Sequence, residues 1–178
     1  NKPSQQGIYQ HYVQVADACP VPVILYNVPG RTGSNIAPET TVRLAAHHNI
    51  IGIKEASGNL EQCMHIAKHK PADFMLISGD DMLTLPMISF GAVGVISVLA
   101  NAFPEKFSHM IRLGLEHKFN EAANLLYDFV DINPMMYEEG NPVGVKALLE
   151  RFSVCSPAVR LPLVEASAGL KDRLFSLL

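Results

Sequence analysis

The sequence predicts an α/β fold built on a parallel sheet and followed by an α-helical tail. Short apolar runs rich in β-branched residues recur in the first part of the chain, and a polar turn follows each run. Segments in which apolar residues have helical spacing separate these runs. Strands this apolar are typical of a sheet covered by helices, so we expect right-handed crossovers and no solvent-exposed sheet face.

Four runs have the length and composition of buried strands. They are residues 23–26, 50–53, 74–77 and 93–98. Two helix starts lie between the first three strands. Pro38 suits a first helical position, and Asn59 with Gln62 resembles a capping box.

The chain after Asn101 is predicted to be helical throughout. Apolar residues recur there at helical spacing in four stripes, with prolines as separators. The stripes are Phe107, Met110 and Ile111; Ala122, Leu125, Leu126 and Phe129; Val145, Leu148, Leu149 and Phe152; and Leu170, Leu174 and Leu177. We therefore expect two domains, residues 1–103 with the sheet and residues 104–178 with helices alone.

Residues 82–104 carry no charged side chain, and their length raises the question of a membrane span. Pro86, Gly91 and Asn101 would break or polarise a spanning helix. A short helix, a glycine turn and a buried strand accommodate all three. We therefore expect no membrane segment.

Composition limits the possible functions. The 178 residues are 48% hydrophobic and 17% charged, which is enough apolar material for a folded core. A net charge of −3 at pH 7 offers no basic face for a phosphate backbone, so nucleic acid is not expected as a partner. Three widely spaced cysteines and no secretory signal predict a cytoplasmic protein with reduced thiols.

Lys54 is the first candidate for chemistry, because it follows the second predicted strand directly. Ligands gather at the carboxyl edge of parallel sheets. An amine in apolar surroundings loses its proton more easily, and the neutral amine can attack a carbonyl carbon to form a Schiff base. The alternative is a strand-end lysine that extends to solvent. Glu55 is an ordinary ion-pair candidate beside it.

Tyr26 occupies the same place at the end of the first predicted strand. Neighbouring parallel strands would bring its phenol and the Lys54 amine to the same edge. A phenol there can pass protons while a carbinolamine forms and dehydrates. The alternative is an amphipathic core tyrosine whose hydroxyl is hydrogen-bonded.

Arg31 lies between two glycines on the loop after the first strand. Its planar guanidinium could bind a carboxylate through two hydrogen bonds, and a solvated loop charge is the alternative. The glycines could also present backbone amides to a phosphate. However, the Lys-Ser/Thr pair of a phosphate-binding loop is missing.

Two histidine pairs raise the question of a metal site. His65 and His69 are four residues apart on a predicted helix, and His47 and His48 are adjacent. Zinc normally needs three or four converging ligands, and the spacing supplies no third one. The two aspartates at residues 80–81 are better explained as caps of the following helix. No metal is expected.

Five segments together resemble the dihydrodipicolinate synthase family, within the N-acetylneuraminate lyase superfamily of class I aldolases. They are residues 25–33 (LYNVPGRTG), 53–58 (IKEASG), 78–81 (SGDD), 94–98 (GVISV) and 141–146 (NPVGVK). The segments stand in the family's order and span essentially the whole chain. The resemblance implies a (β/α)8 barrel of the TIM type with a C-terminal helical domain.

The resemblance also implies an activity and a set of site residues. The family is a lyase that condenses pyruvate with L-aspartate-4-semialdehyde in the diaminopimelate route to lysine. By position, Lys54 would form the Schiff base with pyruvate and Tyr26 would relay protons. Arg31 would hold the semialdehyde carboxylate, and Ile96 and Gly79 would line the pyruvate site. The family needs no metal or organic cofactor and is usually a cytoplasmic homotetramer.

The chain departs from the family in its length. A complete barrel has eight strands and roughly 250 residues, whereas four strands are predicted here. Residues 1–5 resemble the segment after the fourth barrel strand, and the first residue is not an initiator methionine. We therefore expect the second half of the barrel with its helical tail, catalytically weak or inactive alone. The family's pyruvate-carboxylate threonines and other relay tyrosines would be missing.

Two alternatives stay open. The first keeps the Schiff base and changes the aldehyde, as in a sialate lyase or a 2-keto-3-deoxy sugar acid aldolase, although residues 30–33 (GRTG) favour the semialdehyde. The second is a non-catalytic α/β fragment that acts by binding or assembly, with Lys54 in a structural role.

Overall fold

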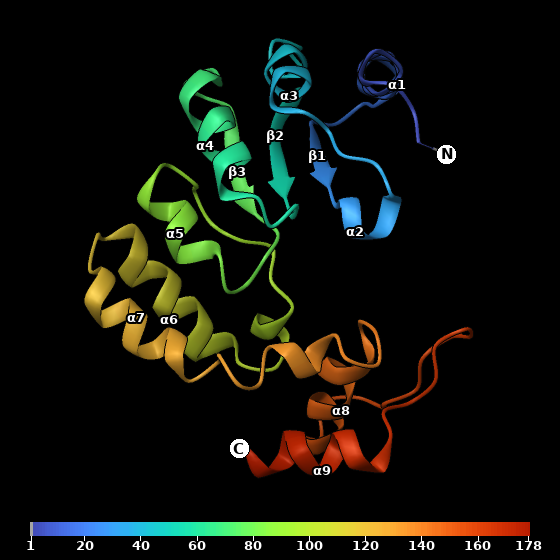
Figure 1. Ribbon diagram of the computed structural model, residues 1–178, viewed down its shortest axis with the longest axis vertical. Coiled ribbons are helices and arrows are strands. Elements are labelled where there is room, and N and C mark those ends of the chain that lie inside the picture. Colours follow the sequence, from blue (N-terminus) through green and yellow to red (C-terminus); the bar gives the residue numbers. More distant parts are fainter. Residues whose placement is uncertain (1) are drawn as a thin grey trace. The chain divides into compact units, whose positions relative to one another are not determined.

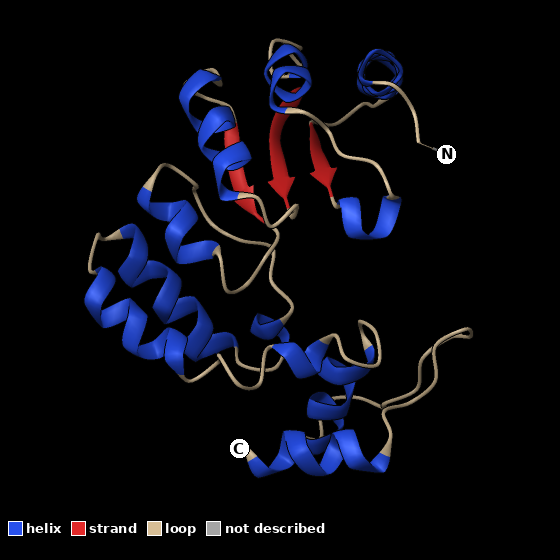
Figure 2. Cartoon of the chain, in the orientation of Figure 1, coloured by secondary structure: helices blue, strands red, loops and turns tan. Residues whose placement is uncertain are grey.

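The computed structural model describes residues 2–178, which divide into two compact units. The first unit ends at Ile96, and the second is Ser97–Leu178. The first contains the sheet and the second contains helices (Figure 2).

The sheet of the first unit has three parallel strands in the order β1-β2-β3 (Figure 1). The strands are β1 (Val23–Asn27), β2 (Ile50–Glu55) and β3 (Met75–Ser78). They match three of the predicted runs to within two residues, so the parallel α/β prediction is confirmed for this part of the chain. Tyr26 of β1 pairs in register with Lys54 of β2, which pairs with Ile77 of β3.

The fourth predicted strand, residues 93–98, is wrong. Only an isolated parallel bridge from Ser78 to Val95 continues the sheet at this edge. Val98 has helical backbone angles and precedes the short helix η1 (Leu99–Asn101), with the Ser97 hydroxyl accepting from the Ala100 amide. The Val93 amide also donates to the Leu76 carbonyl, but among the described residues no second bridge extends this pairing, and helical geometry begins at Val98.

Five helices belong to the first unit: α1 (Gln5–Ala18), α2 (Pro29–Thr32), α3 (Pro38–Leu44), α4 (Leu60–His69) and α5 (Thr84–Ser89). Pro38 begins α3, and the Asn59 side chain accepts from the Gln62 amide at the start of α4, as predicted. However, the Gln62 side chain does not return to Asn59 as it would in a full capping box. Helix α1, which Ser4 caps by accepting from the Gly7 amide, has no counterpart among the predicted elements.

One face of the sheet is covered and the other is partly open, which corrects the expectation of two covered faces. On β1, Leu25 and Asn27 are buried while Ile24 and Tyr26 are about two-fifths exposed. Successive side chains of a strand point to opposite faces. Tyr26 and its register partner Lys54 therefore lie on the face that remains accessible.

Residues 82–104 form α5, a glycine turn and η1. The helix and the turn confirm two parts of the prediction for this segment. Within residues 2–178, no helix combines the length and the apolarity needed to cross a membrane.

In the second unit, each predicted apolar stripe lies mainly on one helix, and Phe129, Phe152 and Leu177 lie just beyond the helix ends. These helices are α6 (Pro104–Leu115), α7 (Phe119–Tyr127), α8 (Val143–Arg151) and α9 (Ala168–Ser176), with the short helix η2 (Pro134–Met136) between α7 and α8. Phe107 and Phe129 are buried, and their ring centroids lie 5.6 Å apart. Leu148, Leu170 and Leu174 are also buried.

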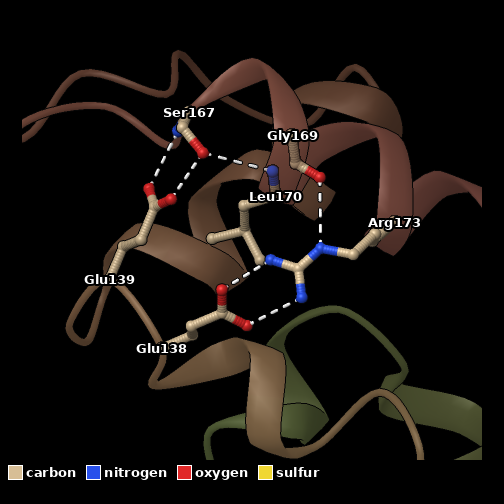
Figure 3. Close-up of polar contacts among 6 residues, drawn as sticks. All are labelled: Glu138, Glu139, Ser167, Gly169, Leu170 and Arg173. Carbon is tan, nitrogen blue, oxygen red and sulfur yellow. Dashed lines mark hydrogen bonds and ion pairs between the residues drawn. The ribbon is translucent and has the colours of Figure 1, made fainter.

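Side-chain hydrogen bonds fix the start of α9 (Figure 3). The Ser167 hydroxyl accepts from the Leu170 amide and donates to Glu139, and the Ser167 amide donates to the same carboxylate. Arg173 pairs with Glu138 through two guanidinium nitrogens. These contacts tie α9 to the loop that precedes α8.

Candidate active site

Lys54 and Tyr26 meet at the carboxyl ends of β2 and β1. The Nζ atom of Lys54 lies 4.2 Å from the centroid of the Tyr26 ring. The parallel register makes the two residues direct neighbours, and register neighbours point to the same face of a sheet. The structure thus brings together the two residues that the sequence analysis selected for chemistry.

Gly79 leaves the space in which the Lys54 side chain lies. It follows β3, and its amide donates to the Glu55 carbonyl at 2.8 Å. A Cβ atom at this position would lie 2.7 Å from Cβ of Ala56 and 3.0 Å from Cε of Lys54. Any larger side chain would therefore collide with the neighbouring loop and with Lys54.

Ile96 lies beside the end of β3. Its amide donates to the Ser78 carbonyl at 3.0 Å, and the Ser78 amide donates to the Gly94 carbonyl at 2.9 Å. The side chain of Ile96 is 48% exposed. Thus the backbone of Ile96 is hydrogen-bonded to the end of β3, directly before Gly79.

Arg31 lies on α2, the single helical turn that follows β1, and it is exposed. Gly33 ends this turn in the left-handed conformation, with φ +66° and its amide donating to the Pro29 carbonyl. No acceptor among the described residues binds the Arg31 guanidinium. The structure therefore leaves this cation available to an anion from outside the chain.

A hollow of about 550 Å³ lies beside β1, α1 and α2. Tyr26, Asn27, Ile8, Tyr12 and Thr32 are among the residues that line it. Burial raises the pKa of the Tyr12 hydroxyl, and a hydrogen bond with the Tyr26 backbone offsets part of that rise. Tyr26 therefore lies between the Lys54 amine and an open space beside the sheet.

Glu55 is not the ion-pair partner that its position next to Lys54 suggested. The carboxylate is 1% exposed and is hydrogen-bonded by Asn27, Gln62 and the Ser57 amide. Across the described part of the chain, no cationic side chain pairs with it. Sequence reasoning missed this buried network, although one signal existed: Asn27 and Glu55 each follow a candidate residue at a strand end.

The other polar candidates lie elsewhere. The Asp80 carboxylate accepts from the Met82 and Leu83 amides, so it caps the turn before α5 and not the helix itself. The His65 and His69 rings stack with their centroids 6.0 Å apart on α4. Within the described residues, no group of three or more His, Cys, Asp or Glu side chains could hold a metal ion.

Comparison with known families decides the relationship. The model of the dihydrodipicolinate synthetase family matches residues 1–178. The chain belongs to this family. Among the similar members is the 4-hydroxy-tetrahydrodipicolinate synthase of Cytophaga hutchinsonii, 58% identical over 170 residues, which are 96% of this chain and 57% of that protein. The enzyme of the same name from Flavobacterium psychrophilum is 53% identical over 175 residues, 98% of this chain and 60% of that protein.

Solved dihydrodipicolinate synthases share the fold. The structure from Thermotoga maritima has a TM-score of 0.96 at 34% identity, and the one from Aquifex aeolicus has a TM-score of 0.95 at 38% identity. The Acinetobacter baumannii structure, described as complexed with pyruvate, has a TM-score of 0.95 at 34% identity. In each case the match covers 99% of this chain and 61% of the solved one.

The family member described here thus spans about three fifths of the length of its relatives. Its three strands form a partial TIM-type barrel with an open sheet, in agreement with the expectation of an incomplete barrel. The prediction of the family from five sequence segments is confirmed.

Proposed function

We propose that this chain is the pyruvate-activating part of a 4-hydroxy-tetrahydrodipicolinate synthase, which condenses pyruvate with L-aspartate-4-semialdehyde. The observation that carries the proposal is the contact between Lys54 and Tyr26, with Nζ 4.2 Å from the ring centroid at the carboxyl edge of the sheet. The names of similar relatives support the choice of reaction.

Schiff-base formation is the first step in this proposal. The Lys54 Nζ attacks the C2 carbonyl of pyruvate and forms a carbinolamine. The Tyr26 hydroxyl passes a proton to the departing hydroxyl, so that water leaves and an iminium remains. Loss of a methyl proton then gives an enamine. Its carbon attacks the aldehyde, and cyclisation through the substrate amine releases Lys54.

The remaining candidates have binding roles in the proposal. Arg31 is exposed and carries no partner within the described chain, which suits a ligand for the semialdehyde carboxylate. Gly79 and the backbone at Ile96 line the sheet edge beside Lys54, which suits the pyruvate site. We propose that the protein acts in the cytoplasm as a homo-oligomer and without a metal or organic cofactor.

An activity assay with a supplied upstream part tests the proposal. The chain is mixed with the part of the Cytophaga hutchinsonii relative that precedes the matched segment, and condensation of the two substrates is followed. We expect little or no turnover by the chain alone and measurable turnover by the mixture, abolished by Lys54→Arg. Equal turnover by the chain alone, or turnover that survives Lys54→Arg, would contradict the proposal.

A second assay tests the choice of aldehyde. Arg31→Ala should raise KM for the semialdehyde in the mixture and leave pyruvate binding unchanged. If the variant keeps its semialdehyde turnover while the parent also accepts sugar aldehydes, the substrate assignment is wrong.

A further inference from the structure

A buried carboxylate lies on the covered side of the two strands that carry Lys54 and Tyr26. Glu55 is 1% exposed, and Asn27, its register partner on β1, is also 1% exposed. These residues directly follow Lys54 and Tyr26. Because successive side chains alternate between the faces of a strand, Glu55 and Asn27 point away from the amine and the phenol.

Among the described residues, each hydrogen bond to the Glu55 carboxylate comes from a neutral donor. The Asn27 amide nitrogen lies 3.1 Å from Oε1 and 2.9 Å from Oε2. The Ser57 backbone amide donates to Oε1 at 2.7 Å, and the Gln62 amide nitrogen donates to Oε2 at 3.0 Å. An ionised carboxylate accepts on both oxygens, whereas a protonated one must donate. In this arrangement both carboxylate oxygens of Glu55 act as acceptors.

The hydrogen bonds form a closed network with one further residue. Asn35 accepts from Asn27 at 2.8 Å and donates to Gln62 at 2.8 Å. The Asn27 side-chain oxygen in turn accepts from the Ile36 amide at 3.0 Å. The network thus joins the ends of β1 and β2 to the start of α4 and to the loop before α3.

Satisfied buried networks of this kind fix one arrangement of the elements they join. Removing one partner leaves a charged or polar group buried without a hydrogen bond, which costs much more than a surface contact. The strand ends are also joined by a backbone hydrogen bond from the Ala56 amide to the Asn27 carbonyl at 2.8 Å. The side chains of Asn27 and Glu55 add a second connection between the same two strand ends.

We propose that Glu55 is a positioning residue, whose buried carboxylate holds Asn27 and thereby keeps the ends of β1 and β2 in the register that places Lys54 against the Tyr26 ring. The importance of this for catalysis rests on the proposed function, but the contact itself can be measured without substrate. A shift of about 1 Å in such a pair can lower a rate by about a hundredfold.

A spectroscopic experiment on the full chain tests the proposal. Reductive methylation with ¹³C-formaldehyde places dimethyl labels on the lysines and keeps their charge, and Lys54→Arg assigns the Lys54 resonance. The Tyr26 ring should displace this resonance upfield, and Tyr26→Leu gives its position without the ring. Glu55→Gln keeps the length of the side chain but replaces one acceptor oxygen with a donor NH2 group, whereas Glu55→Asp keeps the charge and shortens the side chain.

Asn49 provides the matched control. It lies just before β2, at the opposite end of the sheet from Glu55. Its side-chain amide nitrogen donates to the backbone carbonyls of Ala16, Cys19 and Val21. Asn49→Ala therefore removes a comparable set of hydrogen bonds far from the pair. Urea unfolding identifies conditions in which the control and the Glu55 variants are equally folded. If the Glu55 variants do not fold, Asn35→Ala, which changes an exposed residue of the network, replaces them as the test.

The expected result is that Glu55→Gln and Glu55→Asp both move the Lys54 resonance toward its position in Tyr26→Leu. Asn35→Ala should move it less in the same direction, and Asn49→Ala should leave it in place. An unmoved resonance in folded Glu55 variants would overturn the proposal. So would a resonance that moves in Glu55→Gln alone, because the charge and not the geometry would then matter.

Trapping with pyruvate and borohydride adds a chemical readout in the mixture with the upstream part. Relative to Asn49→Ala, both Glu55 variants should be trapped about tenfold more slowly or worse. Trapping at the control rate would count against positioning. A parent chain that traps no pyruvate at all would contradict the proposed function, while the resonance shift would still decide the role of Glu55.

Discussion

Gly79 and Lys54 share a space that admits no additional atom, since a Cβ at position 79 would lie 3.0 Å from Cε of the lysine. Real Cβ atoms rarely approach other atoms this closely. The added Cβ would also lie 2.7 Å from Cβ of Ala56, so it could not be accommodated by a movement of Lys54 alone. The side-chain position of the candidate nucleophile therefore depends on a glycine from the neighbouring strand end.

Gly79→Ala should displace Lys54 and reduce pyruvate trapping. We expect a loss of stability of about 1–3 kcal/mol, as for other overpacked sites, measured by urea unfolding. Gly30→Ala is the matched control, because a Cβ there meets nothing within 4 Å. Equal trapping by the two variants would show that the space beside Lys54 is not critical.

Tyr26→Phe separates the ring from its hydroxyl. The variant keeps the aromatic face over which Nζ of Lys54 lies, but it removes the group proposed to relay protons. We expect Schiff-base formation to slow by about a hundredfold or more, with the fold unchanged. The rate of borohydride trapping in the presence of the upstream part measures this. A variant as fast as the parent would remove Tyr26 from the mechanism.

Cys63 should be inert toward thiol reagents in the folded chain. Burial and the charge of Glu55 raise the pKa of its thiol to about 12, and the side chain is 2% exposed. At pH 8 we expect 5,5′-dithiobis(2-nitrobenzoic acid) to label exposed Cys155 quickly and Cys63 only after denaturation. Rapid labelling of Cys63 in the native chain would contradict the buried network around Glu55.

The attachment of α9 should weaken in acid. Hydrogen bonds from the hydroxyl and the backbone amide of Ser167 lower the pKa of Glu139 below its ordinary value of 4.5. A carboxyl with a lowered pKa stabilises the fold above pH 4.5, and this contribution is lost as the pH falls through the lowered value. The protection factor of the Leu170 amide, which compares its hydrogen exchange with that of an unstructured amide at the same pH, should therefore decrease below pH 4.5.

Glu139→Gln supplies the control for that experiment, because glutamine does not titrate. In this variant the protection factor of the Leu170 amide should change less with pH over the same interval. An identical pH dependence in parent and variant would assign the acid effect to another group, such as Glu138, whose pKa the Arg173 guanidinium also lowers.

Local sequence patterns predicted much of this fold for clear reasons. The three strands are short apolar runs that are followed by turns, and the helices of the second unit follow their apolar stripes. Helix α1 was not predicted, because it buries only Ile8 and Ala16 and its apolar stripe is therefore weak. Residues 93–98 look like a strand by composition, but their pairing depends on neighbours that composition does not describe.

The candidate site also has a part that the sequence predicted and a part that it did not. Lys54 and Tyr26 were predictable because both end apolar strands one βα unit apart, and parallel strands place such residues together. Spacing could have pointed to Asn27 and Glu55, which follow Tyr26 and Lys54, but not to Asn35 and Gln62, which come from a loop and a helix start. Only the folded chain shows that a residue next to Lys54 is buried as an acceptor and not paired with a cation.

Locating the pyruvate adduct tests the central claim most directly. The chain is mixed with the upstream part of the Cytophaga hutchinsonii relative, incubated with pyruvate and borohydride, digested and analysed by mass spectrometry. The account predicts a reduced pyruvate adduct on Lys54 that is absent without pyruvate and absent from Lys54→Arg. An adduct confined to another lysine, or an unmodified Lys54 in a mixture that condenses the two substrates, would contradict it.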